Sequence, residues 1–266
     1  MKISLIITTY NWKEALGLCL QTVLEQTRLP DEIIIADDGS REDTAALIGA
    51  YRQKSPIPVI HSWQPDEGFR LATSRNRGIA RSCGEYIIMI DGDLLLHRKF
   101  CEDHLRNATP GFWVQGTRTH LTPEKSGEIF RTGDTRIGFW GGGVTRRKNT
   151  IYFPLLSRFW KGNQKSVNGS NLAFWRADVL AVNGFNEAFV GWGAEDVEFI
   201  ARMTHRGIRR RNIRFQALSY HLYHEERSRE MLEVNRAILE ETRRTESLRC
   251  AKGIDAYLDE RECDAV

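Results

Sequence analysis

Short apolar runs alternate with segments of helical periodicity through the first 110 residues. The first run, Ile3 to Ile7, is followed by a segment, 12–26, that gathers leucine and valine side chains on one helical face. The runs are nearly continuous in isoleucine and valine, which is typical of parallel strands covered on both faces. The pattern therefore predicts an α/β fold with a mostly parallel sheet. Further strands are predicted at residues 33–35, 57–63 and 85–90, and further helices at 42–51 and 72–84.

The pattern weakens between Gly111 and Gly169, where glycines, basic residues and aromatics follow one another without a clear period. Long loops of this kind are usually functional lids or disordered. The stretch FWGGGVTRRKN is either an irregular connection or a mobile lid, in which Trp140 contacts a sugar and which orders on donor binding. Regularity returns with a helix that ends at Gly207, and residues 227–249 predict an amphipathic terminal helix.

Composition is that of an ordinary soluble globular protein, with 41% hydrophobic and 27% charged residues. The net charge of +3 lacks the concentrated basic character of a dedicated nucleic-acid-binding protein. The five cysteines are scattered without a CxxC pair, so we expect them to be reduced and structural. The first apolar stretch, in MKISLIITTYN, is too short for the apolar region of a signal peptide, and we expect no transmembrane segment and a cytoplasmic protein.

Polar side chains follow the predicted strands. The carboxyl ends of parallel strands meet at one edge of a sheet, where ligands bind. Carboxylates gathered there would repel one another without a cation, so a metal ion or a donor-rich ligand is implied. The residues that follow the strands include Thr8, Tyr10, Asp37, Asp38, Asp91 and Asp93.

The fourth strand ends in two carboxylates separated by a glycine, in the sequence YIIMIDGDLLLH. In a tight turn Asp91 and Asp93 can reach one hard cation together with phosphate oxygens, and Mg²⁺ and Mn²⁺ prefer such ligands. An acidic turn without a ligand is the commoner origin of this motif taken alone. The buried strand before it, together with Asp37 and Asp38, favours the metal site.

Four motifs in order resemble those of family 2 glycosyltransferases of the GT-A fold: SLIITTYN, EIIIADDGS, DEGFRLATSRNRGIARSCGEYIIMIDGD and NGFNEAFVGWGAEDVEF. The resemblance covers residues 3 to about 225. Its later part is also similar to the galactosyltransferase-type C-terminal segment of β-1,4-galactosyltransferases and chondroitin-polymerase-like enzymes. It implies a Rossmann-like nucleotide-sugar-binding domain over 1–225, with a nucleotide-binding half at 1–110 and an acceptor-binding half at 111–225. An amphipathic helix and tail at 226–266 would follow.

In the nucleotide-binding half, the resemblance implies that Thr8 and Tyr10 line the base pocket and that Asp38 accepts the uracil N–H. Arg75 and Asn76 would lie near the nucleotide and its diphosphate. Arginines in such a helix are ordinarily solvated, but the guanidinium group is also well shaped for bidentate phosphate binding.

In the acceptor-binding half, the resemblance implies that Trp192, beside Gly193, packs on a sugar face. Glu195 would hold acceptor hydroxyls, and Asp196 would be the catalytic base. Carboxylates are also favoured at helix N-termini by the helix dipole. The sequence GWG favours function, because a tryptophan between two glycines forms no natural helix cap.

For the metal, the resemblance implies a DxD motif of Asp91 and Asp93 that binds Mn²⁺ or Mg²⁺ with a late histidine. The family usually offers one histidine, whereas YHLYHEE contains His221 and His224. The choice between them stays open, as does an ordinary core or surface role for the pair. It is also open whether Asp91 binds the metal or holds a ribose hydroxyl.

The resemblance thus implies a metal-dependent inverting glycosyltransferase. Such an enzyme needs a base on the acceptor hydroxyl and positive charge on the departing diphosphate. We expect transfer from a UDP-sugar to a saccharide or glycolipid acceptor, in bacterial surface polysaccharide or lipopolysaccharide synthesis. One alternative is a nucleotidyltransferase, although TTYNWKEA lacks the glycine-rich phosphate loop expected after the first strand. A non-catalytic sugar-binding module is the other, although binding alone requires neither metal nor base.

No nucleic-acid partner is expected. The terminal helix and the preceding GIRRRNIR either make peripheral contact with an anionic inner membrane leaflet or belong to an ordinary packed helix. The second interpretation rests on ion pairs such as Glu240 with Arg244.

Overall fold

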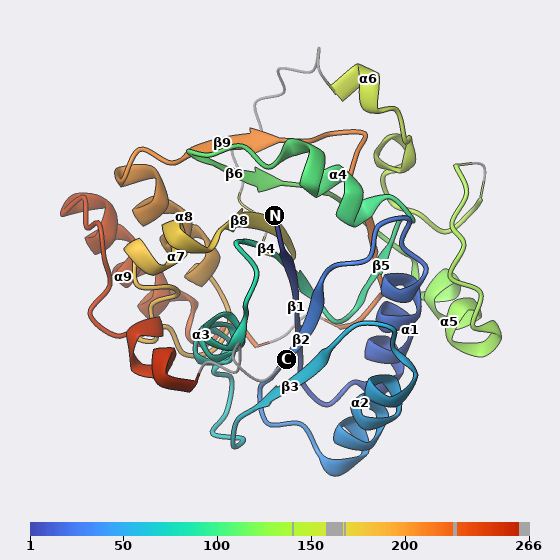
Figure 1. The fold of residues 1–266 in the computed structure, drawn as a ribbon, viewed down its shortest axis with the longest axis horizontal. Coiled ribbons are helices and arrows are strands. Elements are labelled where there is room, and N and C mark those ends of the chain that lie inside the picture. The colour runs from blue at the N-terminus through green and yellow to red at the C-terminus, as the bar shows by residue number, and fades with distance from the viewer. Residues whose placement is uncertain (140, 158–166, 168, 226–227, 261–266) are drawn as a thin grey trace.

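The computed structural model describes residues 1–139, 141–157, 167, 169–225 and 228–260. Within these ranges a seven-stranded sheet is covered by helices on both faces (Figure 1), which confirms the predicted α/β architecture. The strand order is β3 (Val59–Trp63), β2 (Glu32–Asp37), β1 (Ile3–Thr9), β4 (Tyr86–Asp91), β8 (Asn171–Trp175), β6 (Phe112–Gln115) and β9 (Arg209–Asn212).

Strands β1 to β4 pair in parallel, and β6 and β9 are parallel to each other. Among the described strands of this sheet, β8 alone runs antiparallel to its neighbours, β4 and β6. Because β8 joins β4 to β6, the two predicted halves of the domain share one continuous sheet.

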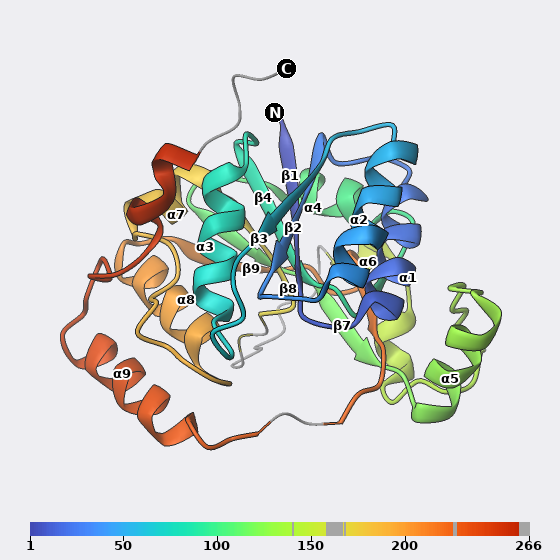
Figure 2. The same ribbon diagram turned by 90° about the horizontal axis from the view of Figure 1, so that it is seen from below.

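Alternate residues of the central strands enter two separate hydrophobic cores, as expected for strands buried on both faces. Leu5 and Ile33 belong to one core, whereas Ile6 and Ile34 belong to the other. The helices of the first face are α1 (Lys13–Leu24), α2 (Glu42–Lys54) and α4 (Phe100–Asn107). Those of the second are α3 (Leu71–Arg81), α7 (Arg176–Ala181), α8 (Glu195–His205) and the 3-10 helix η2 (Ile254–Glu260). Figure 2 shows these two groups on opposite sides of the sheet.

A second, three-stranded sheet lies at the ligand edge of the first, again counting only the described part of the chain. Its strand order is β5 (Leu94–Leu96), β10 (Leu218–His221) and β7 (Thr117–His120). Strand β10 is antiparallel to β5 and parallel to β7. Strand β5 follows the DGD turn and pairs with β10, which ends at His221. This pairing brings the DGD turn close to the late histidines.

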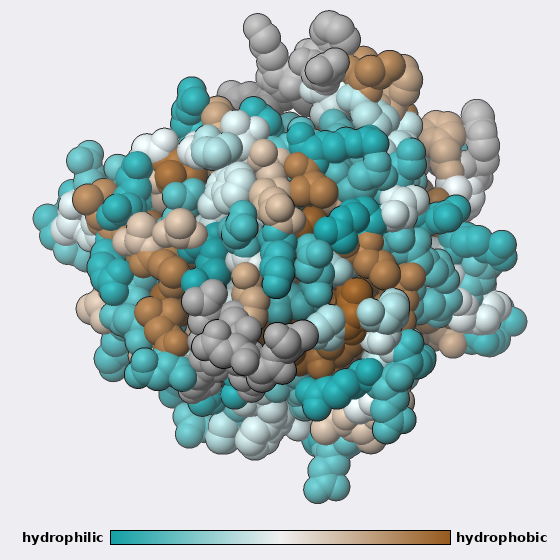
Figure 3. Space-filling model, viewed as in Figure 1, coloured by the Kyte–Doolittle hydropathy of each residue, from teal (hydrophilic) through white to brown (hydrophobic). Residues whose placement is uncertain are grey.

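The expectation that residues 111–169 are irregular is wrong for much of this segment. It contains β6 and β7, and also α5 (Pro123–Thr132), η1 (Arg147–Thr150) and α6 (Pro154–Ser157). Trp140, which we expected in the lid, lies outside the described residues. Apolar side chains of α6 are exposed, including Leu155 at 63% and Leu156 at 39%. They form the brown patch over α6 in Figure 3.

Several predicted boundaries shift. The helix predicted to close at Gly84 ends at Arg81, and the terminal helix α9 (Leu232–Arg244) is shorter than predicted. The ion pairs of α9 join Arg243 to Glu240 and Arg244 to Glu241 rather than Glu240 to Arg244. No helix in the described ranges combines the length and apolar character needed to cross a membrane.

The cysteines are only partly as expected. Cys19, Cys101 and Cys250 are buried and free. Cys83 is disulfide-bonded, so the expectation of reduced cysteines is wrong at this position. Cys263 lies outside the described residues.

Candidate active site

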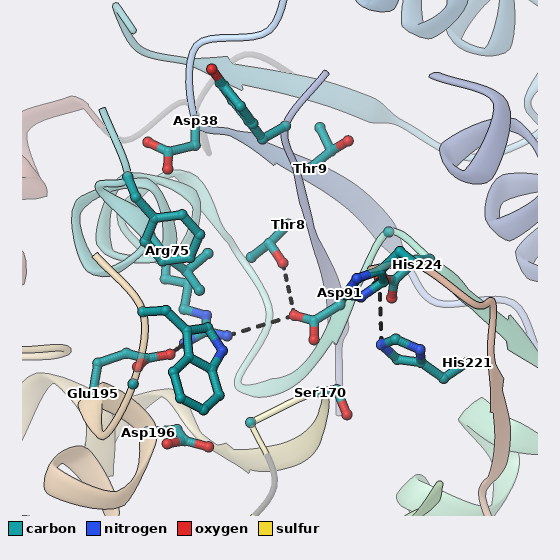
Figure 4. A pocket seen from close by; sticks show the side chains of 18 of the residues that line it. Thr8, Thr9, Asp38, Arg75, Asp91, Ser170, Glu195, Asp196, His221 and His224 are labelled. Carbon is teal, nitrogen blue, oxygen red and sulfur yellow. Dashed lines mark hydrogen bonds and ion pairs between the residues drawn. The ribbon is translucent and has the colours of Figure 1, made fainter. Parts of the chain in front are cut away.

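A cavity of about 560 Å³ opens where the parallel strands of the large sheet end. Its size is that of a small-molecule binding site. Residues from β1, β4, β7 and α8 line it, so both halves of the domain contribute. Figure 4 shows Asp91 in the middle of this cavity, the histidines on one side and Glu195 with Asp196 on the other.

A chain of polar contacts crosses the floor of the cavity from β1 to α8. Thr8 Oγ1 donates to Asp91 Oδ1 at 3.0 Å, and Arg75 Nη2 lies 3.6 Å from the same oxygen. Arg75 Nη1 donates to Glu195 Oε1 at 3.0 Å (Figure 4). The Arg75 side chain is only 2% exposed, and its guanidinium lies 5.1 Å from the Phe185 ring. Arg75 therefore neutralises two acidic residues and fixes α8 relative to β4.

The middle position of the DGD turn has no room for a side chain. A Cβ atom at Gly92 would lie 2.8 Å from the Thr8 carbonyl oxygen, which accepts a hydrogen bond from the Gly92 N–H at the same distance. Beyond this turn, the Asp93 carbonyl accepts a hydrogen bond from Leu222 N at 3.0 Å. The turn thus sends Asp91 toward Arg75 and Asp93 toward β10.

Asp93, His221 and His224 form a cluster that fits a metal ion. Asp93 Oδ2 lies 3.4 Å from Nε2 of each histidine, and one ligand atom from each residue falls within 4.8 Å of the others. Two atoms bound about 2.1 Å from one ion would lie about 3 Å apart. Asp93 Oδ1 is buried and accepts no hydrogen bond from the described residues. An orphaned carboxylate oxygen beside two imidazoles is the donor set that a cation would complete.

Electrostatics at this cluster keep the ligand atoms available. Burial acts to raise the pKa of Asp93, but the nearby His224, His221 and Arg118 outweigh it and hold that pKa below its ordinary value. Burial lowers the pKa of His221, against the opposing effect of Asp93. An ionised carboxylate beside a neutral imidazole is the form that binds metal. Asp91 is not part of this cluster, so its role as a metal ligand stays a prediction.

Glu195 and Asp196 begin α8 at the opposite wall of the cavity. Ala194, immediately before them, has a φ of 71°, and this left-handed turn starts the helix at the cavity surface. Asp196 Oδ1 accepts a hydrogen bond from Val197 N at 2.8 Å. Burial and the neighbouring Glu195 raise the pKa of Asp196 to about 7. A carboxyl group with this pKa can accept a proton near neutral pH.

Asp38 and Tyr10 lie at the far end of the cavity, as the sequence predicted. Asp38 is buried, and its two carboxylate oxygens accept hydrogen bonds from Gln64 Nε2 at 2.6 Å and Arg70 N at 2.9 Å. Tyr10 donates from its hydroxyl to Asp66 Oδ2 at 2.9 Å. Their contacts with a nucleotide base stay predictions.

Asn76 does not reach the cavity. Its amide Nδ2 donates to the Phe185 carbonyl at 2.8 Å and to Glu187 Oε1 at 2.9 Å, and its Oδ1 accepts from Phe185 N. The side chain is fully buried and is absent from the residues that line the cavity. The expectation that Asn76 lies beside the nucleotide does not agree with this position, because the residue after Arg75 projects about 100° further round α3 and meets Phe185 and Glu187 instead. Trp192 and Gly193, by contrast, do line the cavity.

Several cavity residues were missed by the sequence analysis. Arg118 faces Asp91, Asp93 and Asp196, whose charges oppose the lowering of its pKa by burial. The signal for it lay in the alternation of Thr-Arg-Thr-His in β7, which turns Arg118 and His120 to the same side. The missed residues that line the cavity include Arg118, His120, Ser170, Arg229 and Leu232.

Comparisons with known proteins agree with this geometry. Residues 4–179 match the family described as Glycosyl transferase family 2, and residues 156–225 match the N-terminal domain of galactosyltransferase. The chain is 26% identical over 224 residues to the chondroitin synthase of Pasteurella multocida, covering 77% of this chain and 23% of that protein. It is 27% identical over 235 residues to the hyaluronan synthase of Pasteurella multocida, again covering 77% and 23%. The chain thus spans about a quarter of the length of these relatives.

Solved structures share the fold. TarS 1-349 of S. aureus, in complex with UDP, aligns with a TM-score of 0.64 at 18% identity, over 98% of this chain and 70% of that one. The mannosyltransferase PcManGT from Pyrobaculum calidifontis, in complex with GDP-Man and Mn²⁺, aligns with a TM-score of 0.59 at 17% identity, over 97% and 68%. These likenesses establish the GT-A fold.

Proposed function

The chain belongs to glycosyl transferase family 2 and is a glycosyltransferase, and from this premise we propose that it carries out metal-dependent, inverting transfer from a UDP-sugar to a saccharide acceptor. The observation that carries the proposal is the pairing, in one cavity, of Asp196 with the Asp93, His221 and His224 cluster. A base and a cation site on opposite walls suit a displacement that removes a proton at one end and releases a diphosphate at the other.

In the proposed reaction, a new bond forms between the acceptor oxygen and the anomeric carbon of the donor sugar. The bond from that carbon to the diphosphate oxygen breaks, and its electron pair leaves with the UDP. Asp196 accepts the proton of the acceptor hydroxyl. Glu195 holds further acceptor hydroxyls through the oxygen that Arg75 leaves available. Attack opposite to the departing group inverts the anomeric configuration.

Asp93, His221 and His224 would hold the divalent cation, which when bound neutralises charge on the departing diphosphate. Two imidazole nitrogens in this set favour Mn²⁺ over Mg²⁺, since Mg²⁺ prefers oxygen ligands and water. PcManGT, of similar fold, binds GDP-Man with Mn²⁺, which supports this choice. Asp91, held by Thr8 and Arg75, would contact the ribose or the cation from the neighbouring position.

The donor and the pathway are inferred from similar proteins. TarS 1-349 binds UDP and UDP-GlcNAc, which supports a UDP-sugar donor here. Relatives named as chondroitin and hyaluronan synthases support a saccharide acceptor in polysaccharide synthesis. We extend this to bacterial surface polysaccharide or lipopolysaccharide, with a glycolipid acceptor as one form.

The test is a thermal-shift screen of UDP- and GDP-sugars, each with and without Mn²⁺ or Mg²⁺. A ligand present at about 100 times its Kd should stabilise the native protein by about 2.7 kcal/mol. We expect one UDP-sugar to raise the melting temperature only with metal, and Asp93→Ala to abolish the effect. Asp134→Asn, which changes an exposed aspartate remote from the cavity, is the matched control. If no nucleotide sugar stabilises the wild-type protein under any metal condition, the proposal is wrong.

A further inference from the structure

The C-terminal helix α9 lies outside both family matches, the later of which ends at residue 225. The start of α9 and the residues just before it nevertheless reach the cavity, where Leu232 and Arg229 are part of the lining. Figure 2 shows α9 beside α8, at the edge of the molecule to which the strands of the large sheet point. A segment that the family pattern does not include therefore contributes a wall to the active site.

This wall supports the loop that carries Trp192. Gly191, Gly193 and Ala194 have φ values of 74°, 111° and 71°. Glycine adopts such angles freely, but a left-handed alanine persists only where the surroundings hold it. Because the loop is neither helix nor strand, neighbouring elements must supply the contacts that fix it.

Asn235 of α9 supplies two of these contacts. Its side chain is fully buried, and Nδ2 donates to the Val190 carbonyl at 3.1 Å and to the Trp192 carbonyl at 3.4 Å. These hydrogen bonds fix the backbone on both sides of Gly191. They leave the Trp192 ring, in a residue that is 42% exposed, directed to the surface of the cavity.

The loop also packs directly on the first turn of α9. A Cβ atom at Gly191 would lie 2.8 Å from Met231 Cγ, and one at Gly193 would lie 2.9 Å from Leu232 Cδ1. The guanidinium of Arg229 lies 5.5 Å from the Trp192 ring centroid, within cation–π distance. The Trp192 loop therefore packs against this part of the chain with no room for a side chain at either glycine.

The other end of α9 is fixed to the helix that carries the catalytic carboxylates. Thr242 Oγ1 donates to Glu198 Oε1 at 3.1 Å, and Glu198 forms a buried ion pair with Arg202 at 2.8 Å. Helix α9 thus connects the Trp192 loop to α8 through a rigid element with two anchors. The nucleotide end of the cavity, at Thr8 and Asp38, lies on β1 and β2 instead.

We propose that residues 229–235 form the acceptor subsite together with Trp192: Arg229 and Leu232 contact the acceptor saccharide, and Asn235 is the positioning residue of the Trp192 loop. The inference rests on the proposed function and deepens it. An indole face binds the apolar face of a sugar ring, and an adjacent guanidinium offers several donors to sugar hydroxyls or carboxylates. The donor sites lie on other elements, so acceptor binding should depend on α9 and donor binding should not.

The test compares Asn235→Leu with Thr242→Val. Each variant removes one buried hydrogen-bonding group from α9, but only the first touches the Trp192 loop. We expect Asn235→Leu to raise amide hydrogen exchange at residues 190–194 and Thr242→Val to leave it unchanged. With a panel of oligosaccharide acceptors, the acceptor KM should rise about tenfold in Asn235→Leu and in Arg229→Ala. The rate of donor hydrolysis by water should stay at the wild-type value in Thr242→Val, the variant that lies outside the proposed acceptor subsite.

The outcomes separate the two proposals. Unchanged exchange at residues 190–194 in Asn235→Leu overturns the positioning role, whether or not the protein is active. An unchanged acceptor KM in Asn235→Leu and Arg229→Ala overturns the acceptor subsite. If the wild-type protein neither hydrolyses nor transfers any nucleotide sugar, the proposed function fails, and the acceptor subsite that rests on it fails too. The exchange result then still decides whether Asn235 orders the loop.

Discussion

At the scale of single residues, Asp196 combines the position and the proton affinity that a general base requires. It begins α8 at the cavity wall, and burial together with Glu195 raises its pKa to about 7. Arg75 moderates this effect, because its positive charge lies between Glu195 and Asp91. The two acidic residues therefore differ: Glu195 forms an ion pair with Arg75, and Asp196 is left able to exchange a proton.

We predict that kcat/KM rises with pH up to about 7 and then levels, because the base acts only when deprotonated. Asp196→Asn should lower kcat by about 10²–10⁴-fold without this rise. The measurement is the pH profile of sugar transfer for wild type and variant, with Asp134→Asn as control. A wild-type profile that is flat between pH 5 and pH 8 would exclude Asp196 as the base.

The same pKa has a consequence for stability. A carboxyl group whose pKa is raised in the folded state favours folding while it is protonated, and this contribution is lost as the pH rises through about 7. Asparagine does not titrate. The free energy of unfolding of Asp196→Asn, relative to that of wild type, should therefore be higher at pH 8 than at pH 5. Urea unfolding at both pH values measures this difference. Equal differences at the two pH values would contradict the raised pKa.

Arg75 is predicted to matter for stability as well as for geometry. Arg75→Ala should lower the free energy of unfolding by about 3 kcal/mol, because it leaves Asp91 and Glu195 without their shared counter-charge. Arg136→Ala removes an arginine that is 87% exposed and should stay within about 0.5 kcal/mol of wild type. Denaturant unfolding of both variants measures the difference. Similar values for the two would mean that the Arg75 contacts contribute little.

At the scale of elements, the loop between α5 and η1 is tied to the second sheet at its C-terminal end. Thr122 N donates to the Gly143 carbonyl at 2.8 Å, and Thr145 N donates to the His120 carbonyl at 2.9 Å. Val144 forms a β-bridge with Leu121. Since His120 lies beside the His221 ring, at 4.9 Å between centroids, this end of the loop borders the metal cluster. Ligand binding at the metal cluster can therefore change the conformation of this end of the loop.

We predict that a UDP-sugar with Mn²⁺ slows tryptic cleavage after Arg146 and Arg147, which are exposed in the free protein. Ordering of the loop over the bound donor would remove these sites from the protease. Cleavage after Lys252, which is exposed and does not line the cavity, is the internal reference. Unchanged relative rates near Arg146 would count against a lid.

The elements that could be predicted from sequence are those with apolar periodicity. Strands β1, β2 and β4 are rich in isoleucine and could be predicted. Their shared sheet edge led us to expect Thr8, Asp38 and Asp91 close together, and all three line the cavity. Strand β9 has no such signal, since its sequence is Arg-Arg-Arg-Asn. It is stabilised by stacking: Arg209 and Arg211 lie 4.3 and 4.8 Å from the Phe112 ring centroid on β6. Contacts of this kind depend on the partner strand and leave no periodic trace.

The site was predicted as far as its residues follow strands or a known motif. Asp93 and the late histidines were expected together, but the grouping of both histidines with Asp93 depends on the pairing of β5 with β10. Arg118 was missed because β7 was not recognised. The wall from α9 was missed because Arg229 and Asn235 are ordinary helix-surface residues by pattern, and only the tertiary contact with the Trp192 loop gives them a role.

At the scale of the whole molecule, the surface charge is nearly balanced. The net charge is +3, and the basic residues of α9 pair with glutamates of the same helix. Arg209 and Arg211 are partly covered by their stacking on Phe112. Electrostatic attraction to an anionic membrane is therefore distributed and weak rather than concentrated on one face.

We predict that the protein sediments with phosphatidylglycerol vesicles only at low ionic strength and dissociates near 0.15 M salt, where the screening length is about 8 Å. Neutral vesicles should not bind. Binding that persists in about 0.5 M salt would contradict this expectation and would point to an apolar contact through Leu155 and Leu156, which are exposed on α6. Leu155→Ser with Leu156→Ser would then test that contact.

The packing of η2 against α3 bears on how the protein is made. Ile254 is 1% exposed and belongs to the same core as Ile6 and Ile34, although nearly the whole described chain separates them. The Tyr257 hydroxyl, one turn of η2 later, donates to Glu187 Oε2 at 2.9 Å. Ribosomes deliver residues in order, at about 5–20 per second. The sheet face begun by the first strands therefore stays partly uncovered until η2 has been synthesised, and the nascent chain needs protection from aggregation until then.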